Sequence, residues 1–260
     1  MLYRYIVVLF FIGNGLLGGL FLIQPVSAES LVELNAETRL LVALRVGQEE
    51  LQKFVPPPWQ VAPLPGGPLK GANIFIVFID SYLIQDPQGK PFKGGMSRKV
   101  VYAVPSKNMQ TSEMVTVVIG GFETNNDNVP GPYKNYAQAT IRKEQILKGT
   151  NMEAGRGEEF WEVRDNHGAL IELRVQYQGA LPLRVKSEQK LYSAAEPTFY
   201  RIYRQETVGD LVKSIPAGID RIQSYRFHVA VPKLNNLFNG TEQLVGVATY
   251  PLFLRQVFLP

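Results

Sequence analysis

The chain has 260 residues, of which 45% are hydrophobic and 11% aromatic, and it carries 27 basic against 23 acidic side chains. This composition is typical of a globular protein with a sizeable core and excludes a disordered chain. The small, unclustered basic excess argues against a nucleic-acid partner. The chain has two histidines and no cysteine, which excludes disulfides and thiolate metal sites. We therefore expect no metal and no cofactor.

The first 28 residues have the features of an export leader. The basic Arg4 precedes a long apolar stretch, and small residues end the segment at Ala28. An uncleaved membrane anchor is the alternative, because the stretch approaches the roughly 20 residues that span a bilayer. Four glycines and Asn14 within it favour cleavage after Ala28. We predict a leader over 1–28, a periplasmic or extracellular domain over 29–260, and no membrane span after cleavage.

Apolar runs rich in valine, isoleucine and aromatic residues recur along the rest of the chain and predict strands. The predicted strands are residues 39–46, 73–80, 99–104, 114–121, 159–164, 169–177, 199–205, 220–231 and 243–258. Helical patterns are weaker, and they predict short helices over 47–54 and 207–215. The expected fold class is therefore mainly β, of the α+β kind, with a few short helices.

The segment EFWEVRDNHGALIELRVQY predicts a β-hairpin. Apolar and polar residues alternate on both sides of residues 166–168, Asn-His-Gly, which tolerate positive φ. The proline-rich residues 55–71 are compatible with an interdomain linker, but Trp59 and Val61 give them apolar anchors. We expect an ordered loop that crosses one domain.

Common catalytic motifs are absent from the sequence. It contains no nucleophile elbow, phosphate loop, dinucleotide-binding glycine motif or zinc-protease motif. His167 and His228 have no neighbouring carboxylate or serine in a recognisable arrangement, so we expect structural roles for both. Asn239 in NGT fits a glycosylation acceptor, which matters only in a host that glycosylates.

Residues 40–61, LLVALRVGQEELQKFVPPPWQV, resemble the opening of the acetoacetate decarboxylase family, where a strand ending in arginine meets a short helix and a V-P-x-P turn. The matching positions are Arg45, Leu51, Val55, Pro56 and Pro58. The predicted hairpin and the segment PTFYRIYRQ are similar to later parts of the family. The resemblance implies a mainly antiparallel β-cone or barrel with an interior cavity, and it leaves a homo-oligomer open.

Catalytic members of this family use a lysine that forms a Schiff base with a β-keto acid. The resemblance gives this role to Lys134 in PGPYKNY, which follows a predicted strand and Glu123. An ordinary lysine amine titrates near about 10.4, so burial or a nearby cation is needed to keep it neutral. The family's lysine has a second lysine beside it, whereas Lys134 has Asn135. A solvated loop lysine is the alternative interpretation.

The resemblance also implies residues that contact the substrate. Arg39 would hold the leaving carboxylate, and Asp86 would stand for a cavity carboxylate. Tyr136 would share a side with Lys134 if this segment were a strand, as cavity wall or core. The alternative for Arg39 and Asp86 is a surface or strand-edge charge.

Two functions follow from the sequence, and both involve a small-molecule partner. The first is a carboxy-lyase that decarboxylates a small keto acid through an imine on Lys134. The second is a non-catalytic envelope protein that binds a small apolar or carboxylated ligand in the same cavity. A structural β-protein with no ligand is a third alternative.

Overall fold

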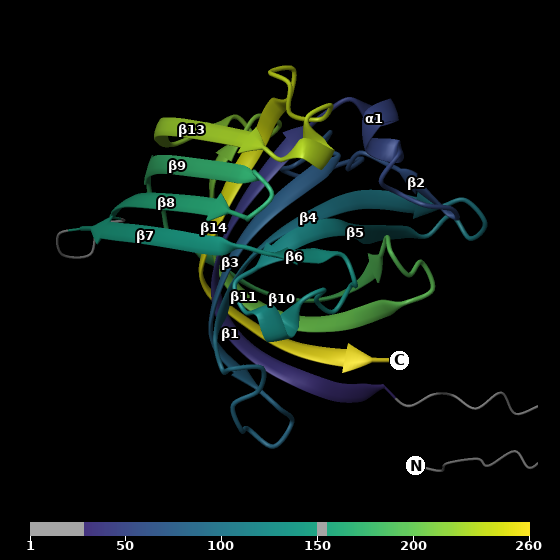
Figure 1. Ribbon diagram of the computed structural model, residues 1–260. Helices are drawn as coiled ribbons and strands as arrows, with labels where there is room; N and C mark the ends of the chain where they lie inside the picture. Colours follow the sequence, from purple (N-terminus) through teal and green to yellow (C-terminus); the bar gives the residue numbers. More distant parts are fainter. Residues whose placement is uncertain (1–28, 150–154) are drawn as a thin grey trace, which may run out of the picture.

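The computed structural model describes residues 29–149 and 155–260, and these residues form two β-sheets (Figure 1). The strands are β1 (Ser30–Arg45), β2 (Trp59–Val61), β3 (Ile74–Gln85), β4 (Ser97–Asn108), β5 (Met114–Glu123), β6 (Tyr136–Gln138), β7 (Thr140–Lys148), β8 (Arg156–Arg164), β9 (Leu170–Gln178), β10 (Leu183–Ser193), β11 (Tyr200–Ser214), β12 (Ile219–Asp220), β13 (Ile222–Ala230) and β14 (Gln243–Leu259). The helical elements are α1 (Gln48–Gln52), η1 (Asn126–Asn128) and η2 (Pro232–Leu234). The predicted fold class is confirmed. The leader predicted over 1–28 lies outside the described residues.

The larger sheet has ten strands, and its pairings form a closed circuit. The order runs β4-β3-β1-β14-β11-β10-β5, and β5 pairs again with β4. These pairings are antiparallel except that between β5 and β10, and β6 also joins β5 in parallel. The mainly antiparallel arrangement expected from the sequence is therefore present, with two parallel exceptions. The circuit encloses a space that its inward-facing side chains line.

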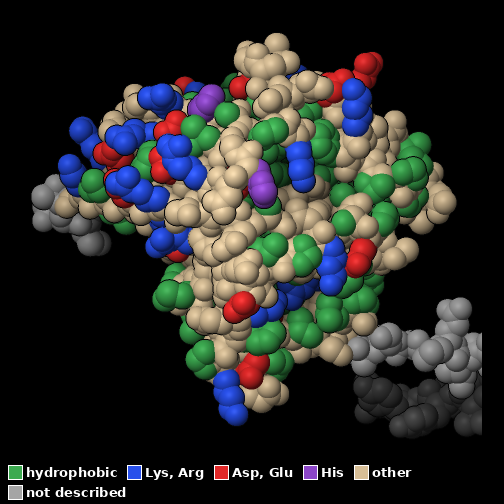
Figure 2. Space-filling view, in the orientation of Figure 1, with side chains coloured by type: hydrophobic (Ala, Val, Ile, Leu, Met, Phe, Trp, Pro, Cys, Tyr) green, Lys and Arg blue, Asp and Glu red, His purple; other side chains and the backbone are tan. Residues whose placement is uncertain are grey.

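The smaller sheet, with the order β13-β9-β8-β7, lies against the outside of this circuit (Figure 1). Trp161 on β8 is fully buried, and its ring lies 5.4 Å from that of Phe78 on β3. The main hydrophobic core therefore lies between the two sheets. Lys and Arg side chains gather over the other face of the smaller sheet (Figure 2), so that face meets solvent.

Strand β4 is apolar on both faces because each face is covered. Its Val100, Tyr102 and Val104 belong to the core between the sheets. The alternate residues Val101 and Ala103 point into the closed circuit. Side chains of a strand alternate between its two faces, and a strand buried on both faces reads as a continuous apolar run rather than an alternating one. This explains the run KVVYAV.

The predicted hairpin and the first predicted helix are both present. Strands β8 and β9 pair over their whole length, and Gly168 in their turn has φ 88°. The Asp165 Oδ1 atom accepts hydrogen bonds from the backbone N–H groups of His167 and Ala169. Helix α1 lies within the predicted range 47–54, and two residues separate it from the arginine that ends β1.

The helix predicted over 207–215 is wrong, because residues 207–214 are the second half of β11. They pair with β14 on one side and, up to Gly209, with β10 on the other. The register with β14 shifts between Val208 and Asp210 and again between Leu211 and Lys213. Such bulges interrupt the strict alternation of a strand. The apolar residues then fall three to four apart, which imitates a helical pattern.

The proline-rich residues 55–71 are anchored to the larger sheet. Trp59 and Val61 are buried, and β2, which contains them, pairs with β4. The Gln52 side chain holds this segment by donating to the carbonyls of Val55 and Trp59. Among the residues that the structure describes, no helix has the length and apolarity to cross a membrane.

Candidate functional site

The closed circuit contains a cavity of about 300 Å³, which we call the inner cavity. Its walls come from β1, β3, β4, β5, β10, β11 and β14, and residues 127–133 with Tyr136 also line it. The lining residues are Glu33, Arg39, Val77, Ile79, Lys93, Lys99, Val101, Ala103, Glu123, Asp127, Asn128, Val129, Pro130, Gly131, Pro132, Tyr133, Tyr136, Leu191, Arg201, Tyr203 and Arg255. Apolar side chains and a cluster of charged side chains therefore share the same enclosed space.

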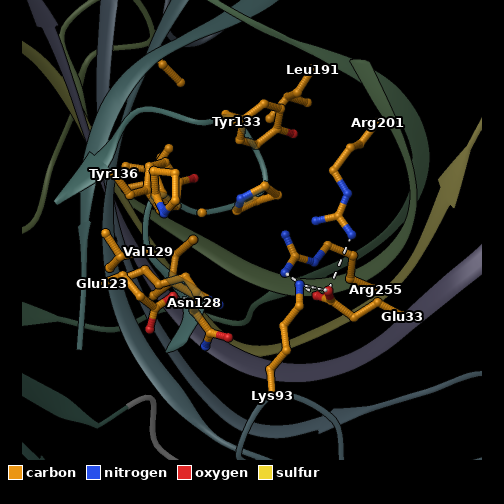
Figure 3. Close-up of a pocket in the computed structure, with 18 of the residues that line it drawn as sticks. Glu33, Lys93, Glu123, Asn128, Val129, Tyr133, Tyr136, Leu191, Arg201 and Arg255 are labelled. Carbon is orange, nitrogen blue, oxygen red and sulfur yellow. Dashed lines mark hydrogen bonds and ion pairs between the residues drawn. The ribbon is translucent and has the colours of Figure 1, made fainter. Parts of the chain in front are cut away.

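Glu33 on β1 is the centre of one group of buried charges (Figure 3). Its carboxylate lies 3.3 Å from Arg201, 3.2 Å from Lys93 and 3.8 Å from Arg255. Burial alone would raise the pKa of Glu33, but Arg201 and Arg255 together lower it well below its usual range. Glu33 is therefore a carboxylate at any physiological pH.

Glu37 is the second buried carboxylate on the same strand. The Arg39 Nε atom donates to it at 2.7 Å, and the Arg255 guanidinium lies 2.7 Å away. Burial opposes ionisation of Glu37, but Arg255 and Arg39 outweigh it and lower the pKa. The Arg39 guanidinium also lies 3.6 Å from the centre of the Phe253 ring. Arg255 joins the two groups because it contacts both glutamates.

This double group has an excess of positive charge. Two carboxylates, Glu33 and Glu37, face the four cations Lys93, Arg39, Arg201 and Arg255. The arginine side chains are 7–11% exposed, so water offsets little of this charge. Buried cations without enough counter-charge are unfavourable. The cavity therefore has a positive field suited to an anion.

Lys99 and Glu123 form a separate ion pair at the cavity wall. The Lys99 Nζ atom lies 3.3 Å from the Glu123 carboxylate, and the two side chains are 13% and 0% exposed. The pair links β4 to β5, which are antiparallel neighbours at this point. Lys93 and Lys99 are the two lysines that line the inner cavity within the described part of the chain.

Tyrosines form the polar part of the opposite wall. The hydroxyl oxygens of Tyr133 and Tyr203 lie 2.5 Å apart, so one hydroxyl donates to the other. The accepting tyrosine keeps its own proton free to donate to a bound oxygen atom. Burial raises the pKa of both Tyr133 and Tyr136 well above the usual range, so these side chains stay protonated.

The segment Pro130–Tyr136 turns so that its neighbouring side chains point in different directions. Gly131 has φ 76°, and a Cβ atom there would lie 2.5 Å from the Tyr136 ring, so only glycine fits. Tyr133 is 2% exposed, and its carbonyl accepts from Ser193 Oγ at 2.6 Å. Lys134 follows with φ 59°, and its side chain is exposed.

The structure brings two of the four sequence-predicted site residues together in the inner cavity. Arg39 and Tyr136 line it. Lys134 lies at the surface, because the turn directs Tyr133 inward instead, so the expected water-poor setting of this amine is not what the structure has. Asp86 lies in the turn after β3 and accepts from the backbone N–H groups of Gln88 and Lys90. It is therefore a turn residue away from the cavity.

Most of the charged residues of the inner cavity were not predicted from the sequence. Glu33, Asn35, Glu37 and Arg39 fall at every second position of a strand, which is a row of polar residues on one face and signals a buried polar site. Arg201 lies inside the apolar run FYRIY at the start of β11, where a charge needs a buried partner. Nothing local marks Lys93, whose loop folds back onto β1. Over residues 29–149 and 155–260, no group of three or more histidine, aspartate and glutamate side chains could hold a metal ion.

Comparison with known proteins gives likeness in structure and none in sequence. No protein-family model matches the chain, and no curated protein matches it. The enduracididine biosynthesis enzyme MppR complexed with pyruvate is similar with a TM-score of 0.58 and 10% identity, over 90% of this chain and 91% of that one.

Two further solved structures are similar over most of the chain. An acetoacetate decarboxylase-like enzyme from Sphingomonas wittichii RW1 has a TM-score of 0.53 and 9% identity, over 88% of this chain and 91% of that one. The acetoacetate decarboxylase of Legionella pneumophila has a TM-score of 0.51 and 11% identity, over 96% of both chains. At such identities the likeness concerns the fold. The chain has the fold of the acetoacetate decarboxylase-like enzymes.

Proposed function

We propose that the protein binds a small carboxylated molecule in the inner cavity. The observation that carries this proposal is an excess of cations over carboxylates. The group consists of two carboxylates, three buried arginines and one partly exposed lysine: Glu33, Glu37, Arg39, Arg201, Arg255 and Lys93. A carboxylate ligand would balance that charge. Guanidinium groups suit this role because their donors match the two oxygens of a carboxylate.

The rest of the cavity fits a short ligand with one more oxygen. The free proton of the Tyr133–Tyr203 pair is available to a keto or hydroxyl oxygen. Val77, Ile79 and Leu191 offer apolar contact to a short carbon chain. The similar MppR structure is a complex with pyruvate, a small keto acid, which agrees in size and charge with this ligand class. We therefore assign small keto acids as the ligand class.

Imine chemistry is the second candidate, and the cavity favours Lys99 for it over Lys134. In such a reaction the Lys99 amine would attack the keto carbon, and water would leave as the C=N bond forms. With a β-keto acid, the bond to the carboxyl carbon would then break, carbon dioxide would leave, and the electron pair would move into the protonated imine to give an enamine.

The ion pair of Lys99 supports a binding function more than this chemistry. The amine must be neutral to attack, yet Lys99 forms an ion pair with Glu123 at 3.3 Å. Lys134, the residue suggested by the family resemblance, is exposed and does not line the cavity. Ligand binding needs neither lysine to be neutral. We therefore propose a binding function first and an imine lyase second.

Calorimetric titration with pyruvate, acetoacetate and the uncharged ketone acetone tests the binding proposal. The two acids should bind, and acetone should bind at least about tenfold more weakly, because it lacks the carboxylate. Lys93→Gln should weaken binding of the acids about three- to tenfold. Lys90→Gln is the matched control, because Lys90 is an exposed lysine of the same loop outside the cavity lining. Equal binding of acetone and the acids would contradict the proposal.

Borohydride trapping separates the two candidates. The protein is reduced with saturating pyruvate or acetoacetate, and the adduct is located by mass spectrometry in the wild type, Lys99→Arg and Lys134→Arg. Binding without any adduct supports a binding protein. An adduct lost in Lys99→Arg supports the imine lyase at the cavity wall, and one lost in Lys134→Arg would restore the role first expected for Lys134.

A further inference from the structure

A second cavity, also of about 300 Å³, lies outside the closed circuit, between β4, β5, the β8–β9 turn and η2. We call it the outer cavity. It is lined by Phe54, Tyr102, Ile119, Gly120, Gly121, Phe122, Asn135, Ala137, Asp165, His167, Ala169, Val231, Pro232, Lys233 and Leu234. We propose that it binds a small, mostly apolar molecule with one hydroxyl group, of the phenol class.

The Tyr102 hydroxyl is the first observation that points to a ligand. Tyr102 is 5% exposed, and its hydroxyl has no hydrogen-bond partner among the described residues. An unpaired buried hydroxyl is unfavourable by about 1–3 kcal/mol, and native structures contain few of them. Burial, with the nearby charge of Asp165, raises the pKa of Tyr102 well above its usual range. The hydroxyl therefore stays neutral and can both donate and accept.

Asn135 is a second lining residue of the outer cavity that has an unpaired polar atom. Its Nδ2 atom donates to the Val118 carbonyl at 2.8 Å, which fixes the orientation of the amide. The Oδ1 atom is then left buried, and it has no hydrogen-bond partner within the described part of the chain. A ligand hydroxyl can accept from the Tyr102 hydroxyl or donate to the Asn135 Oδ1 atom.

The local irregularity of β5 creates the space beside Tyr102. Tyr102 pairs with Gly120 and Ala103 with Val118, so Ile119 is an extra residue without a partner on β4. Bulges of this kind re-aim side chains and occur next to binding sites. Gly120 has no side chain, and a Cβ atom there would lie 3.4 Å from the Tyr102 ring. The missing side chain of Gly120 therefore leaves a methyl-sized gap beside the Tyr102 ring.

The walls of the outer cavity favour an aromatic body on the ligand. Phe54, Ile119 and Leu234 are apolar, and the Phe122 ring lies edge-on to Tyr102 at 6.2 Å between centroids. His167 and Lys233 are exposed lining residues and form the rim. An apolar lining with a few convergent polar atoms is the usual make-up of a small-molecule site.

The outer cavity is independent of the inner one. The two share no lining residue, because they lie on opposite faces of β4. The residues 133–137 separate them, because Tyr133 and Tyr136 line the inner cavity whereas Asn135 and Ala137 line the outer one. A ligand can therefore occupy the outer cavity whether or not the inner cavity binds a keto acid.

Titration with phenol and with toluene, followed by amide chemical shifts in NMR, tests this site. Phenol should bind at least about fivefold more tightly than toluene, which has the same shape without hydrogen-bonding capacity. The largest shifts should fall on Gly120, Gly121 and Ala137. Equal affinity, no binding of either compound, or shifts confined to the inner cavity would overturn the proposal.

Two variants and one control make the test specific. Tyr102→Phe should abolish the preference for phenol and leave toluene binding within about twofold. Tyr225→Phe is the matched control, since the Tyr225 hydroxyl is also buried without a hydrogen-bond partner among the described residues but lines neither cavity. Gly120→Ala should weaken the binding of both compounds, because the added methyl group fills the space beside the Tyr102 ring. A phenol preference that survives Tyr102→Phe, or an affinity that Gly120→Ala leaves unchanged, would contradict the site.

Discussion

The hydroxyl groups of Tyr133 and Tyr203 meet at 2.5 Å inside the inner cavity, although 70 residues separate them in the chain. Each is buried, at 2% and 3% exposure. Tyr133→Phe or Tyr203→Phe should each lower the free energy of unfolding by about 1–3 kcal/mol, because the remaining hydroxyl loses its partner. The double variant should lose clearly less free energy of unfolding than the two single variants lose together.

Urea denaturation of the four proteins gives this double-mutant cycle. Strictly additive losses would show that the two hydroxyls do not interact. Tyr225→Phe serves again as a reference, because it removes a buried hydroxyl that has no hydrogen-bond partner in the described part of the chain. Its removal should leave the free energy of unfolding unchanged or raise it by at most about 1–3 kcal/mol, because no hydrogen bond is lost.

Glu33 predicts how stability depends on pH. Its pKa in the folded protein lies well below the usual range, owing to Arg201 and Arg255 acting against burial. A lowered folded-state pKa contributes stability that is fully present above the unfolded-state pKa of about 4.3 and is lost as the pH falls through the folded-state value. The free energy of unfolding should therefore fall as the pH drops from about 5 to about 2.

Glu33→Gln should flatten this pH dependence, measured as urea midpoints at several pH values between about 2 and about 7. The variant should also be less stable at neutral pH, because Arg201 and Lys93 lose a buried counter-charge. Glu158→Gln is a suitable control, since Glu158 is a partly exposed residue whose pair with Arg174 is long, at 3.8 Å. If the urea midpoint of Glu33→Gln fell between about pH 5 and about pH 2 as much as that of the wild type, the role given to this carboxylate would be contradicted.

Gly120 and Gly121 are neighbours on β5 with different tolerance for a side chain. A Cβ atom on Gly121 would lie 2.5 Å from the Val100 carbonyl oxygen and 3.1 Å from the Tyr136 ring. Gly121→Ala should therefore cost about 1–3 kcal/mol of stability, because backbone cannot move aside easily. At Gly120 the nearest atoms are 3.4–3.9 Å away, which is ordinary contact. Thermal unfolding of Gly120→Ala and Gly121→Ala measures the contrast, and equal midpoints would refute it.

The leader predicted from the sequence makes a separate prediction about processing. If the chain is exported through residues 1–28, the mature protein should begin at Glu29. Intact mass measurement of the secreted or periplasmic protein, made from the full chain, checks this start. Ala28→Leu should slow cleavage, because small residues are needed at the site. A product that retains Arg4 would favour the membrane-anchor alternative.

The fold was easier to predict from the sequence than the site was. Runs such as NIFIVFID and KVVYAV are apolar on both faces, so they signalled strands whatever their partners. Strand β10 was missed because its residues 183–190 are exposed and mostly polar, and bulges disguised the second half of β11. Both segments are strands because they pair with other strands, and such pairing leaves no local sequence pattern.

The site depends on residues that meet only in three dimensions. Arg39 and Tyr136 were predicted and line the inner cavity, while Glu33, Arg201 and Arg255 come from β1, β11 and β14. Tyr133 and Lys134 differ by one position, and the φ values of Gly131 and Lys134 decide which of the two side chains points inward. A family motif matched by spacing alone cannot resolve a difference of one residue in a turn.

The pairing of β1 with β14 has a consequence for the order of folding. The first described strand needs the last one as a neighbour along almost its whole length, and β11 needs it as well. A nascent chain that lacks residues 243–259 therefore has two open strand edges, and its larger sheet stays incomplete until β14 has been synthesised. Contacts so distant along the chain make for slow folding, which leaves time for a newly made chain to be moved or bound by a chaperone while still unfolded.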